Sequence, residues 1–233
     1  MKIEVDFNKF STVYDKGCPQ LIWRDIVSDL ETPVSVFLKV AEGRKNSFLL
    51  ESVEGGNIRG RYSIIGLKPD LVWRCQENRV EINRHDINDK SNFELSKKKP
   101  IESLKDLLEE SKIEIPEGLP PMSAGLVGYL GYDMVKYMEK LPKNNPDTLN
   151  LPDALLIRPT LMVIFDSVKD TISLVTAVWP DKNIDSHLAY EQAILRLSGL
   201  ISDLEKSLTI PCLLYTSDAA DEGLGVDLGG RRI

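Results

Sequence analysis

The chain has 233 residues, of which 42% are hydrophobic and 28% charged, so it can bury the core of one large domain or two small ones. Its formal charge of −7 argues against a nucleic-acid or anionic-membrane surface, because those partners attract basic proteins. No run approaches the roughly 20 apolar residues of a membrane-spanning helix, and the N-terminus has no signal-peptide pattern. We therefore expect a soluble, cytoplasmic protein whose partners are small molecules or other proteins.

The first half of the chain predicts one helix followed by a series of strands. Apolar residues after Pro19 recur at helical spacing, and proline is favoured in the first turn of a helix. Runs rich in β-branched residues then alternate with turn-forming sequences, and the short connections imply antiparallel pairing. The expected elements are a helix over 22–30 and strands over 34–39, 47–51, 61–65, 71–75 and 79–83.

The second half predicts two helices and another hairpin. Residues 84–99 are polar and charged without an apolar period, so we expect an exposed loop there. Glycines at 125, 128 and 131 predict a strand whose backbone is closely approached by another element. The other expected elements are a helix that begins at Pro100 and ends before Pro116, a hairpin over 155–165 and 171–178, and a helix over 188–208. The whole pattern is that of an α+β fold, with mainly antiparallel sheets and flanking helices.

Residues that commonly carry catalysis or bind metals are sparse. Cys18, Cys75 and Cys212 lie far apart, without the CxxC spacing of a metal site or redox pair. His85 and His187 have no neighbours in a metal-ligand pattern. The glycines of GLVGYLGYD do not form a GxGxxG motif, and the chain has no GxSxG nucleophile motif. We therefore predict no catalytic residue and no metal site in this chain.

One short segment combines groups that could bind a ligand. The sequence SFLLES at 47–52 places Glu51 and Ser52 side by side at the end of an apolar strand, before a glycine-rich loop. A carboxylate and a hydroxyl can accept hydrogen bonds from the ammonium group of an amino acid, and such bonds are worth about 1.5 to 3 kcal/mol each. The alternative is structural, with Glu51 solvated and Ser52 satisfying the turn. On spacing alone, the structural alternative is favoured.

Three stretches resemble signature segments of anthranilate synthase component I. They are SFLLESVEGGNIRGRYSIIGLKPD at 47–70, PPMSAGLVGYLGYD at 120–133 and LPDALLIRPTLMVIFD at 151–166. The second stretch is shared with aminodeoxychorismate synthase component I. The acid of LLES, followed by VEGG and RYSIIGLKP, points toward the anthranilate enzyme. Residues 1–211 thus resemble the N-terminal portion of the component I fold.

The resemblance implies an enzyme that converts chorismate to anthranilate and pyruvate in a Mg²⁺-dependent reaction. A glutamine amidotransferase partner supplies the ammonia, and tryptophan inhibits by feedback. In the family the inhibitor site uses the LLES segment, which ends here in Leu50, Glu51 and Ser52, together with a later segment that this chain lacks. The resemblance therefore implies that Leu50 packs on the indole ring, that Glu51 supplies complementary charge and that Ser52 bonds the ammonium group.

The resemblance also implies that the chorismate and Mg²⁺ sites lie in a C-terminal portion that is missing here. On that basis the chain binds no cofactor and is inactive alone. Two other interpretations stay open. One is aminodeoxychorismate synthase component I, and the other is a non-catalytic amino-acid-binding module, which a natural end of the protein near Pro211 would support.

The last part of the chain resembles non-natural sequence. From Cys212 it reads CLLYTSDAADEGLGVDLGGRRI, similar to a translated sequencing adapter, and the alternative is a natural tail rich in Gly and Asp. We therefore expect a truncated regulatory region at 1–211 and a non-native tail at 212–233. The tail has four acids and two bases, so subtracting its −2 from −7 leaves −5 on residues 1–211. The argument from acidic charge is unchanged.

Overall fold

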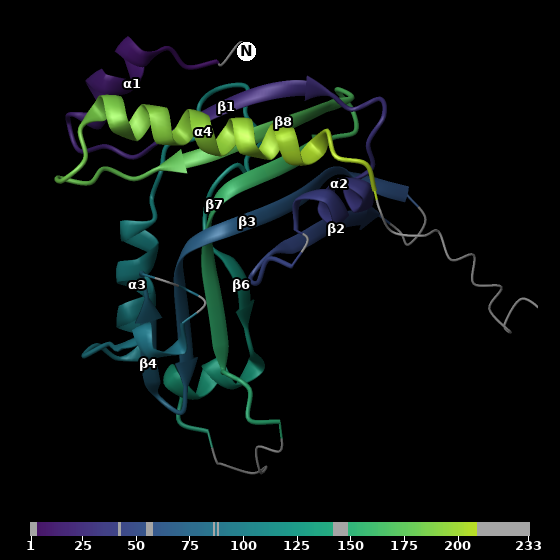
Figure 1. Ribbon diagram of the computed structural model, residues 1–233. Coiled ribbons are helices and arrows are strands. Elements are labelled where there is room, and N and C mark those ends of the chain that lie inside the picture. The colour runs from purple at the N-terminus through teal and green to yellow at the C-terminus, as the bar shows by residue number, and fades with distance from the viewer. Residues whose placement is uncertain are drawn as a thin grey trace, which may run out of the picture.

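The computed structural model describes residues 4–41, 43–54, 58–85, 87, 89–141 and 149–208. Within them a curled antiparallel sheet is packed by helices, which confirms the predicted α+β fold (Figure 1). None of the helices in these ranges is long and apolar enough to cross a membrane. The predicted tail lies outside the described residues, so the division at residue 211 stays a prediction.

The described chain contains four α-helices, two short 3₁₀ helices and eight strands. The α-helices are α1 (Phe7–Tyr14), α2 (Pro33–Val40), α3 (Pro100–Glu110) and α4 (Ser186–Leu204), and the 3₁₀ helices are η1 (Lys90–Asn92) and η2 (Tyr132–Tyr137). The strands are β1 (Gln20–Val27), β2 (Phe48–Glu54), β3 (Ile58–Gln76), β4 (Arg79–Asn83), β5 (Glu94–Leu95), β6 (Val127–Leu130), β7 (Ala154–Asp166) and β8 (Thr171–Val178).

Two long strands, β3 and β7, form the centre of the sheet and pair antiparallel along most of their length. Different strands flank β3 and β7 at the two ends of this pair. At one end the order is β1-β8-β7-β3-β2, and at the other end it is β6-β7-β3-β4-β5. We call the first end the helix-covered half (β1, β2, β8 and residues 62–67 and 161–166). The second end is the α3 half (β4, β5, β6 and residues 71–76 and 154–158).

The central strands bend where the two halves meet. The register of β3 and β7 shifts between Pro69 and Leu71, and Pro69 lies opposite Pro159. Proline has no N–H to donate to the ladder. Lys68, directly before, has a φ of +47°, a left-handed conformation that is uncommon for a non-glycine residue. Because these features interrupt the ladder, β3 and β7 change direction here (Figure 1).

The buried apolar residues form separate clusters on the two faces of the helix-covered half and on the α3 half. α1, α2 and α4 cover one face of the helix-covered half, where Phe10, Ile65 and Leu197 are fully buried. The opposite face of that half buries Ile164 and is packed by apolar residues from the segment after α3. α3 and η2 pack on the α3 half, around Trp73, Leu107 and Met134. The helix-covered half therefore has an apolar core on both faces.

The predicted helix over 22–30 is wrong, because this segment forms β1, which pairs with β8 along its whole length. Leu21 and Ile22 are both buried, but in clusters on opposite faces of the sheet. The apolar residues of β1 are interrupted by Arg24 and Asp25, so they do not alternate with polar residues as in a half-buried strand, and they match helical spacing by chance.

The predicted strand over 34–39 is also wrong, because these residues lie in α2. The start of α2 carries a capping box, in which Thr32 accepts a hydrogen bond from the backbone N–H of Ser35 and the Ser35 hydroxyl accepts one from the N–H of Thr32. Pro33 occupies the first turn. These signals outweigh the β propensity of the valines.

The remaining predictions hold in large part. The runs at 61–65 and 71–75 are the two halves of the single strand β3, and 79–83 is β4. The predicted hairpin is β7–β8, and α3 and α4 lie at the two predicted helices. The loop over 84–99 is interrupted by η1 and the two-residue β5. A Cβ added to Gly128 would lie 2.0 Å from the carbonyl oxygen of Leu155, so β7 does approach the backbone of β6 closely.

Candidate functional site

The candidate ligand-binding residues lie in the middle of β2, an outer strand of the helix-covered half, because the strand continues to Glu54 instead of ending at residue 51 as predicted. Leu50 lies opposite Ile64 of β3, and Glu51 lies opposite Ser63. Among the described strands, β2 pairs with β3 alone. An edge strand exposes backbone N–H and C=O groups along its unpaired side, and these groups can bind a ligand.

Leu50 and Glu51 project to opposite faces of the sheet. Leu49 packs against the cluster beneath the helices, whereas Phe48 packs against the cluster on the other face. Because successive side chains alternate along a strand, Leu50 shares the face of Phe48 and Glu51 that of Leu49. Leu50 is 45% exposed, and both Glu51 and Ser52 are exposed. A ligand that contacts all three must therefore lie across the edge of β2.

Ser52 lies in a bulge of β2. The register against β3 shifts between Glu51 and Val53, which leaves Ser52 outside the regular ladder. A Cβ added to Gly60 would lie 2.1 Å from the Ser52 hydroxyl oxygen. The absence of a side chain at Gly60 thus leaves the space that the Ser52 side chain occupies.

Glu51 and Ser52 are chemically able to bind a cation. Within the described residues, neither side chain makes a hydrogen bond or an ion pair. A carboxylate accepts hydrogen bonds at both oxygens, and a hydroxyl accepts as well as donates. The pair therefore offers acceptors to an ammonium group.

An ion pair braces the strand next to this edge. Arg61 of β3 binds the carboxylate of Asp166 through two hydrogen bonds, Nε to Oδ1 at 3.0 Å and Nη2 to Oδ2 at 2.8 Å. Asp166 also accepts hydrogen bonds from the N–H groups of Val168 and Lys169. Hydrogen bonding to Arg61 lowers the pKa of Asp166, and the two backbone bonds lower it further. The brace fixes the part of β3 that follows Gly60.

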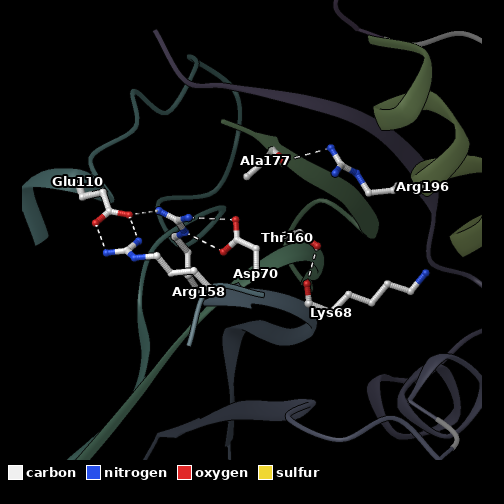
Figure 2. A network of polar contacts seen from close by, with 8 residues as sticks. Lys68, Asp70, Glu110, Arg158, Thr160, Ala177 and Arg196 are labelled. Carbon is white, nitrogen blue, oxygen red and sulfur yellow. Dashed lines mark hydrogen bonds and ion pairs between the residues drawn. The ribbon is translucent and has the colours of Figure 1, made fainter. Parts of the chain in front are cut away.

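A second polar cluster lies at the bend of the sheet. The guanidinium of Arg158 binds Asp70 through two hydrogen bonds of 2.8 and 3.1 Å, and its Nη1 lies 3.5 Å from Oε1 of Glu110 (Figure 2). Its Cζ lies 4.2 Å from the centre of the Trp179 ring. Arg158 is 8% exposed. Our sequence analysis did not predict this cluster, although an arginine within the apolar run of β7 is a signal that a buried partner is needed.

The other residues weighed for chemistry are dispersed. His85 lies 3.9 Å from Glu94, and His187 lies 3.7 Å from Glu191 on the surface of α4. Cys18 is exposed and Cys75 is buried, both as free thiols. In the parts of the chain that the structure describes, no group of three or more His, Cys, Asp or Glu side chains could hold a metal ion.

Comparison with known proteins gives a consistent set of relatives. The chain is 44% identical over 201 residues to anthranilate synthase component 1 of Cereibacter sphaeroides, a match that covers 86% of this chain and 40% of the relative. It is 38% identical over 194 residues to the protein of the same name from Pseudomonas putida, covering 79% of this chain and 36% of the relative. No protein-family model matches.

A solved structure shares the fold. The crystal structure of anthranilate synthase component I from Streptococcus pneumoniae superposes with a TM-score of 0.51 and 19% identity, over 79% of this chain and 37% of the solved chain. The chain therefore spans about two fifths of the length of the relatives that it matches.

Proposed function

The chain is a homologue of anthranilate synthase component 1 over most of its length, and on this basis we propose that it is the N-terminal, regulatory part of the chorismate-using subunit of an anthranilate synthase. The reaction would join chorismate with ammonia from a glutamine amidotransferase subunit, giving anthranilate and pyruvate in tryptophan biosynthesis. The observation that carries the proposal is the 44% identity over 201 residues.

The proposal assigns catalysis to polypeptide outside this chain. The matched relatives are more than twice as long as the segment that they share with it. We place the chorismate and Mg²⁺ sites in that remainder, as the resemblance implies, so the chain by itself would form no anthranilate. The described residues supply the fold on which the remainder packs and one side of a regulatory site.

Exposed apolar side chains support an unfinished surface on the α3 half. Large apolar residues around β6 and η2 face solvent, namely Tyr129, Leu130, Tyr132, Met138, Leu149 and Leu151. Clusters of exposed apolar side chains are typical of interaction sites. We propose that the remainder of the longer protein covers it. The amidotransferase subunit would then bind a different surface.

For regulation, we propose that tryptophan binds across the edge of β2. Its ammonium group would lie near Glu51 and Ser52, and its indole ring would contact Leu50 on the other face. The support is the exposure of all three residues, the bulge at Ser52 and the lack of competing partners for Glu51 and Ser52 among the described residues. A second part of the site would come from the remainder of the protein.

The test uses the protein encoded by the uninterrupted natural gene. Anthranilate is followed by its fluorescence, with chorismate, Mg²⁺ and ammonium as substrates and tryptophan as inhibitor. We expect activity in the longer protein and none in the 233-residue chain. Activity that yields aminodeoxychorismate instead, or a natural stop codon near residue 211, contradicts the assignment.

The regulatory site is tested in the same longer protein with Ser52→Ala. Loss of one charge-assisted hydrogen bond should raise the tryptophan concentration for half inhibition by about tenfold or more, since such a bond is worth about 1.5 to 3 kcal/mol. Thr12→Ala, which removes an exposed hydroxyl from α1, is the control and should leave inhibition unchanged. Equal inhibition of Ser52→Ala and the parent protein would remove Ser52 from the site.

A further inference from the structure

A cavity of about 350 Å³ lies between β4, the turn that follows β5, and α3. Small-molecule sites in proteins have volumes of about 300 to 1,000 Å³. Part of the lining is apolar, formed by Ile82 of β4 and Leu107 of α3, and Leu107 is 1% exposed. Lys97 and Lys98 of the turn also line the cavity, and both are exposed. The cavity therefore runs from solvent to a buried, apolar floor.

Hydrogen bonds hold the turn after β5 in place. The N–H of Ser96 donates to the carbonyl oxygen of Val80 in β4 at 2.9 Å, and the Ser96 hydroxyl accepts a 3.2 Å hydrogen bond from the N–H of Lys98. The Lys98 ammonium then forms an ion pair with Asp106 of α3. The turn is thus tied to β4 on one side and to α3 on the other, so the walls of the cavity are formed before any ligand binds.

The charged side chains of the lining have one positive charge in excess. They are Arg84, Lys97, Lys98, Asp106 and Glu110. Asp106 pairs with Lys98, and Glu110 accepts a 2.7 Å hydrogen bond from Nη2 of Arg84. Lys97 has no ion-pair partner among the described residues. Three cations and two acids give the lining a formal charge of +1, in a chain whose formal charge is −7.

Glu110 is shared between two arginines. Besides Arg84 it faces Arg158, whose Nη1 lies 3.5 Å from Oε1 of Glu110 (Figure 2). Arg158 has a carboxylate partner of its own in Asp70. Adding Arg158 and Asp70 to the count adds one cation and one acid, so the excess of one positive charge remains.

Ser103 of α3 places a hydrogen-bond donor at the buried end of the cavity. It lines the cavity and is 3% exposed. Its Oγ accepts a 3.1 Å hydrogen bond from Nε1 of Trp73. A hydroxyl donates as well as accepts, and no described residue accepts the Ser103 proton. A buried donor without an acceptor costs stability, so an acceptor bound in the cavity would remove this cost.

We propose that this cavity binds a small monocarboxylate with an apolar body. One carboxylate balances the excess charge of the lining. Ser103 and Asp106 are three residues apart on one face of α3, so the Lys98 ammonium held by Asp106 lies beside the Ser103 hydroxyl, and both can donate to the same carboxylate. The apolar body would contact Ile82 and Leu107.

The acids of the lining argue for a single negative charge on the ligand. Asp106 and Glu110 would repel the second charge of a phosphate group, whereas a monocarboxylate leaves the lining neutral. The cavity is separate from the edge of β2, and the inference does not rest on the function proposed above.

The experiment titrates the 233-residue chain with benzoate and, separately, with benzamide, which has nearly the same shape without the charge. Binding is measured by nuclear magnetic resonance at constant ionic strength set with sodium chloride. We expect saturable binding of benzoate, and binding of benzamide and inorganic phosphate that is weaker by about tenfold or more. Lack of saturable benzoate binding, or equal binding of benzamide, overturns the proposal. Tighter binding of phosphate than of benzoate overturns the choice of a monocarboxylate.

Variants of opposite sign separate binding from unfolding. Asp106→Asn removes the acid that competes for the Lys98 ammonium and should tighten benzoate binding by about two- to fivefold. Lys97→Ala and Lys98→Ala should each weaken it by a similar factor. A gain in affinity from Asp106→Asn cannot result from loss of the fold.

Two exposed lysines outside the cavity provide matched controls. Lys112→Ala removes a lysine paired with Glu109 at 2.8 Å, as Lys98 is paired with Asp106. Lys182→Ala removes an exposed lysine from the segment between β8 and α4. Both variants should bind benzoate as the parent does. Unchanged binding in Asp106→Asn, Lys97→Ala and Lys98→Ala would show that the cavity is not the site.

Discussion

The two halves of the bent sheet share β3 and β7 but differ in what covers them. The helix-covered half has three helices on one face and a second apolar cluster on the other, and its larger cluster contains eighteen buried residues. The α3 half has one α-helix and a cluster of eight buried residues, and it leaves large apolar side chains around β6 exposed. The comparison teaches that the first half has an apolar core on both faces, whereas the second leaves apolar side chains in solvent, where we propose that further protein packs.

The first prediction tests whether the helix-covered half holds most of the stability. Leu197→Ala, on the buried face of α4, should lower the free energy of unfolding by about 2 to 5 kcal/mol, because it creates a cavity in the larger cluster. Leu107→Ala, on the buried face of α3, should fall at the lower end of that range, because its smaller cluster can collapse more easily. Urea unfolding followed by circular dichroism gives both values. Leu195→Ala removes an exposed side chain from the solvent-facing side of α4 and should change the free energy of unfolding by less than about 0.5 kcal/mol. A larger loss from Leu107→Ala would reverse the comparison.

The second prediction concerns the joint between the halves. Arg158→Ala leaves Asp70 without its cation, whereas Glu110 keeps Arg84, and should cost about 2 to 4 kcal/mol, somewhat below the usual range for a buried pair because Asp70 is partly exposed. The double variant Arg158→Ala with Asp70→Ala should lose less than the sum of the two single variants. Strict additivity in this double-mutant cycle would show that the two residues do not stabilise each other.

The third prediction uses pH to probe the brace beside the candidate tryptophan site. The pKa of Asp166 is lower in the folded protein than in the unfolded chain, where it is about 3.9. The ionised carboxylate therefore stabilises the fold above that pH, and this stabilisation is lost as the pH falls through the pKa of the folded protein. Asp166→Asn should therefore cost about 1 kcal/mol at pH 7, an estimate reduced for the exposure of Arg61. The difference from the parent should shrink below about pH 4. The stability difference between the two proteins is measured from urea unfolding at several pH values. A difference that does not change with pH would show that the ionised Asp166 carboxylate is not its cause.

The sequence predicted the fold best where a local signal matched the final environment. The β7–β8 hairpin, α3 and α4 carry clear periodicity and turn residues, and Gly128 marks a close backbone contact. It failed at β1, because Arg24 and Asp25 break the alternation of its apolar residues, and its pairing with β8 depends on residues far away in the chain. The bend of β3 and β7 could not be predicted from the sequence either. The two prolines that face each other there are some ninety positions apart in sequence, and nothing local shows that they pair.

The candidate site was predictable in part. Glu51 and Ser52 are exposed on an outer strand, but the continuation of that strand to Glu54 and the opposite orientation of Leu50 and Glu51 follow only from the pairing with β3. The buried Nε of Arg196, which has no hydrogen-bond partner among the described residues, could not be predicted, because the burial of a single side-chain atom has no sequence signature.

The last prediction addresses α2, the helix that the sequence pattern assigned as a strand. Thr32→Ala removes the side-chain acceptor for the N–H of Ser35 and half of the capping box, so it should lower the free energy of unfolding by about 1 kcal/mol. Thr32→Ser keeps the hydroxyl and should stay near the parent. If both variants match the parent in urea unfolding, packing of Val36 and Val40 against the cluster beneath α4 is enough to hold α2, and the cap is not what selects helix over strand. If Thr32→Ala alone is destabilised, the capping box and the core act together in holding α2 as a helix.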